Sequence, residues 1–232
     1  MRYVVTTGGG DVEDFASKEV YSVLESRLYT AVVSDVLDSL GYRNQVMRAD
    51  LNPLIAGSVV AGRARTLLAV DYYELLEQPY ETEMRFIEAL NPGDIVVAGT
   101  NQSVENGLWG ELLTTAAKIR GARGAIIDGV IRDVRKIKGM DFPLWCTGSK
   151  PVDSAGRGMT LGYDYSIKCG GVLVHSGDVV FGDEDGIVVI PEQLVAQVVR
   201  LALEKVTAED ATRQSLRDGM SLLEVYKKFG VL

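Results

Sequence analysis

The sequence predicts an α/β protein built on a mixed sheet, with helices before and after the sheet. From Gly57 onward, short runs rich in β-branched residues are separated by glycines, a pattern typical of strands. Two segments with helical spacing, residues 80–90 and 110–119, lie between such runs. This alternation indicates that helices connect some of the strands, which is typical of α/β folds.

The first 45 residues are predicted to form a helical segment. "DVEDFASKEVYSVLESRL" places apolar residues such as Val20 and Leu24 at helical spacing, and "TAVVSDVLDSLG" repeats the pattern. Thr30 is a candidate N-cap for the second helix, and Gly41 is a candidate C-terminal stop. Two helices are therefore expected before the main sheet.

The sheet itself is predicted from residue 57 to residue 190. Its expected strands are "SVVAGRARTLLAV", "GDIVVAG", "GAIIDGVI", "FPLWCTG", "GGVLVHSGDVVFGD" and "GIVVIP". Asp128-Gly129 inside the third run is predicted to be a turn or a bulge.

Residues 191–232 are predicted to form a C-terminal helical arm. A long amphipathic helix follows Pro191, and a shorter one is expected in "SLLEVYKKFG". Such an arm packs either on a neighbouring subunit or back on its own domain, and the sequence leaves both arrangements open. At 232 residues the chain can bury a sizeable core, so we expect a single domain over residues 1–232.

The charge balance excludes some classes of partner. Lysine and arginine number 24 against 32 acidic residues, giving a net charge of −8, and no basic block is available to neutralise phosphates. We therefore expect neither a nucleic-acid binder nor a membrane binder. Cys146 and Cys169 lack CxxC spacing, so neither a disulfide framework nor a structural zinc is expected. With no apolar run of about 20 residues and no recognisable signal peptide, a cytoplasmic protein is expected.

The stretch "WGELLTTAAKIRGARGAIIDGVIRD" holds three charged groups with a regular separation. Twenty residues lie between Glu111 and the pair Arg132-Asp133. A helix of about eleven residues runs roughly 16 Å, and a strand of about six residues returns roughly 20 Å. If this strand is parallel to the strand before the helix, all three groups meet at one edge of the sheet.

That edge has the chemistry to hold an anion and a cation. The amides of Leu112 and Leu113 lie in the first helical turn, where a carboxylate or phosphate can dock, and Arg132 can grip the same anion. Asp133 and Glu111 are hard oxygen ligands for Mg²⁺ or Mn²⁺. Purely structural interpretations remain open, since the helix dipole favours a first-turn glutamate and Arg-Asp can be a surface pair worth about 0–1 kcal/mol.

These residues resemble the signature of a known family. An acid, twenty residues and then Arg-Asp is the pattern of the family that joins 4-hydroxy-4-methyl-2-oxoglutarate aldolases with RraA, the regulator of ribonuclease E activity. The flanking pieces agree: "TAVVSDVLDSLG", "AGRARTL", "NPGDIVVAG", "FPLWCTGSKPVDSAGRG" and "SGDVVFGDEDGIVVIP". The resemblance therefore covers nearly the whole chain.

The resemblance implies an RraA-like swivelling β/β/α domain that forms a homotrimer or homohexamer, with the active site between subunits. In the aldolases of this family, pyruvate chelates a divalent metal and is held by an arginine and two backbone amides. Carried over, Arg132 binds pyruvate and stabilises enolate charge, Asp133 ligates Mg²⁺ or Mn²⁺, and Glu111 holds metal-bound water. Gly110, Leu112 and Leu113 line the substrate site, the two leucines supplying the amides.

The same resemblance implies an acid from the C-terminal helix of the neighbouring subunit, acting on the metal through water. Glu209 in "AEDATR" is the best match, and Glu204 is the second choice. Two positions depart from the family pattern. Lys136 replaces an acid that members often carry three residues after Arg-Asp, and Ala98-Gly99 replaces an aspartate. The first departure puts the identity of the substrate in question.

The function implied is a divalent-metal-dependent class II aldolase, a lyase that cleaves 4-hydroxy-4-methyl-2-oxoglutarate-type 2-oxo acids to pyruvate. Oxaloacetate decarboxylation is a further expected activity, because both reactions leave the enolate of pyruvate. The sequence leaves the general base open; water held by Glu111 is one candidate. The alternative is an RraA-type regulator that inhibits a ribonuclease without catalysis, and a third hypothesis is an isomerase or decarboxylase of another 2-oxo acid.

Several other features are set aside. The glycines at residues 8–10 lack a GxGxxG pattern, so an S-adenosylmethionine site is not expected. The chain has a single histidine, His175, and no serine nucleophile elbow, so a Ser-His-Asp hydrolase is not expected. No lysine lies in an evident apolar pocket motif, so a Schiff-base aldolase is less attractive than a metal-dependent one. Four aromatic residues are expected to serve packing: Tyr72, Tyr73, Tyr80 and Trp145.

Overall fold

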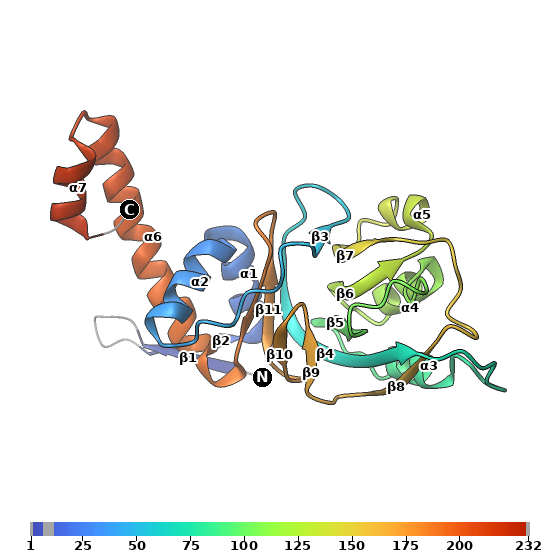
Figure 1. The fold of residues 1–232 in the computed structure, drawn as a ribbon. Helices are drawn as coiled ribbons and strands as arrows, with labels where there is room; N and C mark the ends of the chain where they lie inside the picture. The colour runs from blue at the N-terminus through green and yellow to red at the C-terminus, as the bar shows by residue number, and fades with distance from the viewer. Residues whose placement is uncertain (1, 7–11, 231–232) are drawn as a thin grey trace.

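The computed structural model describes residues 2–6 and 12–230. The predicted α/β class is confirmed: a curled mixed sheet carries helices, and a long C-terminal helix extends away from it (Figure 1). The glycine cluster at residues 8–10 lies outside the described residues. In the described part of the chain, no helix is both long enough and apolar enough to cross a bilayer.

The main sheet has eight strands within the described part of the chain. In spatial order, its path runs through β12 (Ile187–Ile190), β11 (Val179–Gly182), β4 (Val60–Asp71), β5 (Asp94–Gly99), β6 (Gly124–Ile131), β7 (Leu144–Ser149) and β3 (Asn52–Pro53), while β8 (Gly158–Tyr163) pairs with β4 off this path. The central strands β4, β5, β6 and β7 are parallel, and the other pairs are antiparallel. A short separate pair, β9 (Ile167–Cys169) and β10 (Val172–Val174), completes this region.

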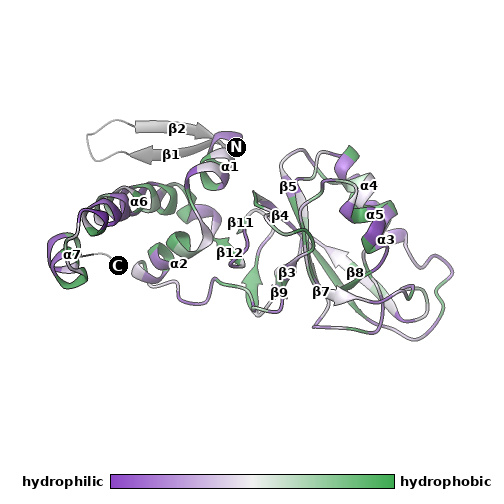
Figure 2. Cartoon of the chain, turned by 90° about the horizontal axis from the view of Figure 1, so that it is seen from above, coloured by the Kyte–Doolittle hydropathy of each residue, from purple (hydrophilic) through white to green (hydrophobic). Residues whose placement is uncertain are grey.

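The helices form two groups at opposite ends of the molecule, as Figures 1 and 2 both show. One group holds α3 (Glu81–Glu88), α4 (Glu111–Ile119) and α5 (Val134–Lys138). The other holds α1 (Ser17–Arg27), α2 (Thr30–Ser39), α6 (Val195–Arg217) and α7 (Leu222–Phe229), together with the hairpin of β1 (Arg2–Thr6) and β2 (Val12–Ala16). A short 3₁₀ turn, Glu192–Leu194, precedes α6. The predicted helices at both ends of the chain are therefore present, but the first one begins only at Ser17. The expectation of a helical segment over the first 45 residues was wrong for Arg2–Thr6 and Val12–Ala16, because these residues pair with one another as strands.

Three apolar clusters explain this arrangement, because each amphipathic helix buries one face. The first lies between α1, α2 and α6 and the strands β11 and β12. The second lies between α3, α4 and α5 and one face of the parallel strands. The third covers the other face of those strands and includes β9, β10 and the buried Trp145. Both Cys146 and Cys169 are buried and free.

The predicted N-cap of the second helix was also wrong. Thr30 is the first residue of α2 and not its N-cap, which is Tyr29. The amide and the hydroxyl of Thr30 donate to the two carboxylate oxygens of Asp183, at 2.8 and 2.7 Å. A distant loop thus satisfies the start of the helix, and this long-range contact replaces the local cap. Gly41, by contrast, adopts φ +88° just after the helix, as the predicted stop requires.

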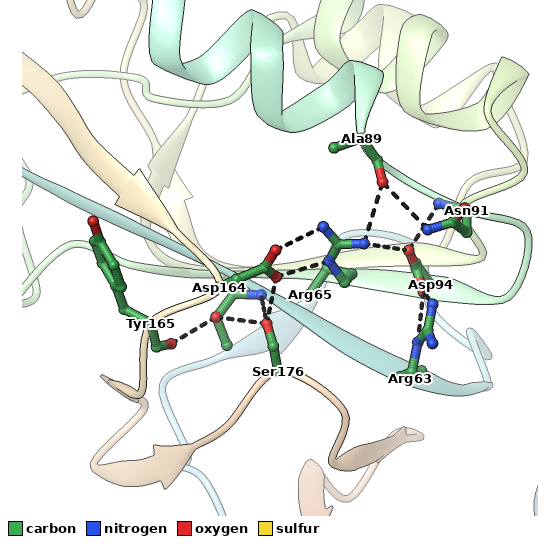
Figure 3. Close-up of polar contacts among 9 residues, drawn as sticks. Arg63, Arg65, Ala89, Asn91, Asp94, Asp164, Tyr165 and Ser176 are labelled. Atoms are coloured by element: carbon green, nitrogen blue, oxygen red, sulfur yellow. Dashed lines mark hydrogen bonds and ion pairs between the residues drawn. The ribbon is translucent and has the colours of Figure 1, made fainter. Parts of the chain in front are cut away.

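A charge network fixes the starting edge of the parallel strands (Figure 3). Asp94, fully buried at the first position of β5, accepts from Arg63 at 2.7 Å and lies 3.5 Å from a guanidinium nitrogen of Arg65. Arg65 in turn pairs with Asp164 at 2.9 Å, and Ser176 donates to the same carboxylate. These groups pair with one another and with neighbouring backbone, so the network ties strands and loops together at this edge.

Candidate active site at the carboxyl edge of β6

The segment before α4 lies beside the end of β6. Trp109 forms a parallel bridge with Ile131, and the amide of Arg132 donates to the carbonyl of Trp109 at 2.8 Å. The buried indole of Trp109 donates to the hydroxyl of Thr114 at 2.8 Å, which fixes the first turn of α4. Since β5 and β6 are parallel, the helix and strand return to the same edge, as the spacing predicts.

Asp133 holds the two parts of this edge together. It adopts a left-handed conformation, with φ 58° and ψ 29°, at the start of α5. Its Oδ2 accepts from the amide of Glu111 at 3.1 Å. A Cβ atom at Gly110, the N-cap of α4, would lie 2.8 Å from the same oxygen, so a glycine is needed for this close approach. Backbone conformations of this uncommon kind cluster at functional sites, and aspartate tolerates the left-handed region better than most residues.

A cavity of about 370 Å³ opens at this edge, within the range of small-molecule sites. Five of the residues selected from the sequence line it: Gly110, Leu112, Leu113, Arg132 and Asp133. Glu111 adjoins it through the hydrogen bond to Asp133. The remaining lining residues, which were not selected as site residues, are Tyr80, Glu83, Met84, Leu108, Ala116 and Ser154.

Arg132 is oriented by a second acid. A guanidinium nitrogen of Arg132 lies 3.3 Å from Oδ1 of Asp153, and the hydroxyl of Tyr80 donates to Oδ2 of the same residue at 2.6 Å. Burial raises the pKa of Asp153, but the hydrogen bond from Tyr80 and the charge of Arg132 outweigh burial and hold this pKa below its usual value. Asp153 is therefore a fixed anion that positions the arginine. Tyr80, expected only to pack, also takes part in this polar wall.

Comparison with known proteins adds an independent observation. The family described as aldolase/RraA matches residues 30–189, which include the whole cavity edge. The chain belongs to the aldolase/RraA family.

Individual relatives match this aldolase/RraA protein over most of its length. A protein of Halalkalibacterium halodurans, provisionally named a 4-hydroxy-4-methyl-2-oxoglutarate aldolase, is 30% identical over 85% of this chain and 89% of its own. The crystal structure of Streptomyces coelicolor RraAS2, titled an unusual member of the RNase ES inhibitor RraA family, has a TM-score of 0.76 and 29% identity, covering 85% of this chain and 97% of that one. A further structure, whose title describes novel cellulases from gut-associated microbes, has a TM-score of 0.81 and 29% identity over 85% and 88% of the two chains. These names differ in function, so the fold alone does not select one.

The departure at Lys136 has a structural consequence in this aldolase/RraA protein. The ammonium of Lys136 lies 3.7 Å from Oε2 of Glu111, while Oε1 of Glu111 accepts from the hydroxyl of Thr115 at 3.1 Å. This chain therefore places a positive charge beside Glu111. Lys136 is largely exposed, so solvent and salt screen the interaction.

Two residues of this edge carry the kind of oxygen that a divalent cation binds. Asp133 and Glu111 supply carboxylate oxygens, which suit Mg²⁺ or Mn²⁺, and Mg²⁺ commonly uses one or two carboxylates with waters and substrate oxygens. Among the described residues of one chain, no group of three or more His, Cys, Asp or Glu side chains is placed to hold a metal. The donor set thus fits a cation that borrows further ligands from the substrate or from elsewhere.

Glu209, selected as a contribution from a neighbouring subunit, lies on α6, at the opposite end of its own chain from α4 (Figures 1 and 2). There the hydroxyl of Tyr29 donates to Glu209. Burial and the carboxylate of Glu209 raise the pKa of Tyr29 to about 12. Glu204, the second choice, pairs with Arg200 at 2.9 Å. The contribution of either acid to the cavity of another subunit stays a prediction.

Glu83 is the acidic residue among the cavity residues that sequence reasoning missed. It is 5% exposed, and its Oε1 has no hydrogen-bond partner in the described part of the chain. Burial raises the pKa of Glu83 to about 7, opposed by Arg132 and assisted by Asp153. A signal was available: Glu83 shares the inward face of α3 with Phe86 and Ile87, at positions i, i+3 and i+4. An acid on an apolar helix face indicates either a buried pair or a functional carboxyl.

Proposed function

We propose that this protein is a divalent-metal-dependent class II aldolase that cleaves 4-hydroxy-4-methyl-2-oxoglutarate-type 2-oxo acids to pyruvate, and that the same site decarboxylates oxaloacetate. The observation that carries the proposal is the convergence of Arg132, Asp133 and the first turn of α4 on one cavity. The provisional name of the relative from Halalkalibacterium halodurans supports the same reaction class.

Each residue has a role that follows from its chemistry. Arg132 is a permanent cation at the cavity wall and binds the carboxylate of the 2-oxo acid. The amides of Leu112 and Leu113, in the first turn of α4, donate to the same anion. Asp133 would ligate Mg²⁺ or Mn²⁺ and Glu111 would hold water bound to the metal; such a cation, when bound, would polarise the 2-oxo carbonyl. The charge of Arg132 lies beside the position where negative charge develops during cleavage and stabilises it.

The same site can serve both proposed reactions. Breaking the bond between C3 and C4 of a 4-hydroxy-2-oxo acid, or losing carbon dioxide from oxaloacetate, leaves the enolate of pyruvate. A site that stabilises this enolate lowers the barrier of both reactions. We further propose that the active oligomer is a homotrimer or homohexamer in which Glu209 of one subunit approaches the cavity of the next, and that the enzyme acts in the cytoplasm.

The test is pyruvate release by the purified full-length chain. 4-Hydroxy-4-methyl-2-oxoglutarate and oxaloacetate are supplied with Mg²⁺ or Mn²⁺, and pyruvate is followed with lactate dehydrogenase. We expect turnover well above the metal-only rate, with Arg132→Ala losing roughly 100-fold or more in kcat/KM. Arg135→Ala is the matched control, because Arg135 is exposed on the adjacent helix α5. Turnover at the metal-only rate, or full activity in Arg132→Ala, would refute the proposal.

A second candidate function is supported by the likeness to RraAS2, whose title names a ribonuclease-inhibitor family. A regulator of this type would keep the fold without using the cavity. Stoichiometric capture of a ribonuclease, together with no binding of Mn²⁺ in the presence of pyruvate, would favour it over the aldolase.

A further inference from the structure

The buried carboxyl of Glu83 differs from the other buried carboxyls of the described chain. Asp94, Asp128 and Asp178 each place both carboxylate oxygens in hydrogen bonds or ion pairs. Glu83 is 5% exposed, and its Oε1 has no partner among the described residues. The three aspartates are therefore structural anions, whereas Glu83 has bonding capacity that the fold does not use.

An unpartnered carboxyl at such a position is costly to the fold. Burying a polar atom without a hydrogen bond is unfavourable, and a glutamine or an apolar residue would fill the same space at lower cost. Glu83 also lines the cavity that holds Arg132 and Asp133, and its unpartnered Oε1 is shielded from solvent in the cavity wall. A costly group at a cavity wall is a candidate for function.

The charges around Glu83 allow it to take either protonation state near neutral pH. Tyr80, the residue that precedes the same helix, also lines the cavity, and its hydroxyl donates to Asp153. Across the cavity, Arg132 lowers the pKa of Glu83, while Asp153 raises it. Asp133 lines the same cavity. Burial is the largest influence and sets the pKa at about 7, which is well matched to proton transfer at physiological pH.

We propose that Glu83 is the proton-transfer residue of this cavity, an inference that rests on the proposed lyase function. The Glu83 carboxylate takes the proton of the 4-hydroxyl group as the C3–C4 bond breaks. The C4–O bond becomes a carbonyl, and the electron pair of the broken bond forms the enolate of pyruvate. The protonated Glu83 then gives the same proton to C3, which yields the methyl group of pyruvate and restores the carboxylate. Atoms and electrons balance without a further reactant.

The second half of this cycle can be measured on pyruvate alone. In D₂O with Mg²⁺, the wild-type protein should exchange the methyl protons of pyruvate for deuterium, followed by ¹H NMR. Its exchange rate should rise through about pH 7 as Glu83 ionises. Glu83→Gln keeps the shape and removes the titrating group, so exchange and retro-aldol kcat should fall roughly 100-fold or more while pyruvate still binds. Glu88→Gln, at an exposed position of the same helix, should match the wild type.

Rescue separates proton transfer from a merely structural role. Added formate or acetate should partly restore exchange in Glu83→Ala, in proportion to its concentration, because a small acid can occupy the vacated space. Wild-type exchange in Glu83→Gln, an unchanged pH profile in that variant, or no rescue would overturn the role of Glu83 and leave the lyase function intact. An inactive wild type, in exchange and in cleavage, would instead overturn both proposals together.

Discussion

The difference in stability between Glu83→Gln and the wild type is predicted to depend on pH, and unfolding experiments test this independently of activity. Glu83 has a folded-state pKa of about 7 against an ordinary value of 4.5. Between these values the folded chain keeps a proton that the unfolded chain has lost, so the free energy of unfolding falls as the pH rises from about 4.5 to about 7. Above pH 7 the group costs the fold roughly 3 kcal/mol, at 1.36 kcal/mol for each pKa unit.

Replacing the acid by a neutral isostere removes this cost. Glu83→Gln should equal the wild type in stability near pH 4.5 and exceed it by up to roughly 3 kcal/mol at pH 8. Urea unfolding, followed by circular dichroism at fixed protein concentration from pH 5 to pH 8.5, measures the difference. Glu88→Gln, exposed on the same helix, should show no such gain. A stability difference that is flat with pH, or destabilisation by Glu83→Gln at pH 8, would show that Glu83 is not held in the unfavourable environment described.

Three further outcomes are expected. Asp94→Asn should lower the free energy of unfolding by about 3 kcal/mol in urea titrations, because it removes the buried anion shared by two arginines. Lys136→Gln should tighten Mn²⁺ binding a few-fold at low ionic strength and not at high salt, measured by electron paramagnetic resonance, because it removes the positive charge 3.7 Å from Glu111. Gly110→Ala should lower kcat/KM for pyruvate formation by roughly 100-fold with little change in Tm, because its Cβ would displace the Asp133 carboxylate.

The sequence determined the elements and one part of the site. Periodicity predicted the strands around Val96 and Ile127 and the helices α3, α4 and α6, because burial of one face imposes the period of each element on its apolar residues. The spacing of twenty residues placed Glu111 at the same edge of the sheet as Arg132 and Asp133. The helix starts at the edge where β5 ends, and the parallel strand β6 ends at that same edge.

Only the tertiary structure decided the rest of the cavity. Tyr80, Glu83 and Asp153 come from segments before and after the signature stretch. The periodicity of a single helix or strand does not predict which residues of other elements they face. The cap of α2 was missed for the same reason, since Asp183 supplies it from a distant loop. Sequence spacing fixes what one element presents on each face. The pairing of faces depends on how helices and sheet pack together, and that packing brings an unpartnered acid beside Arg132.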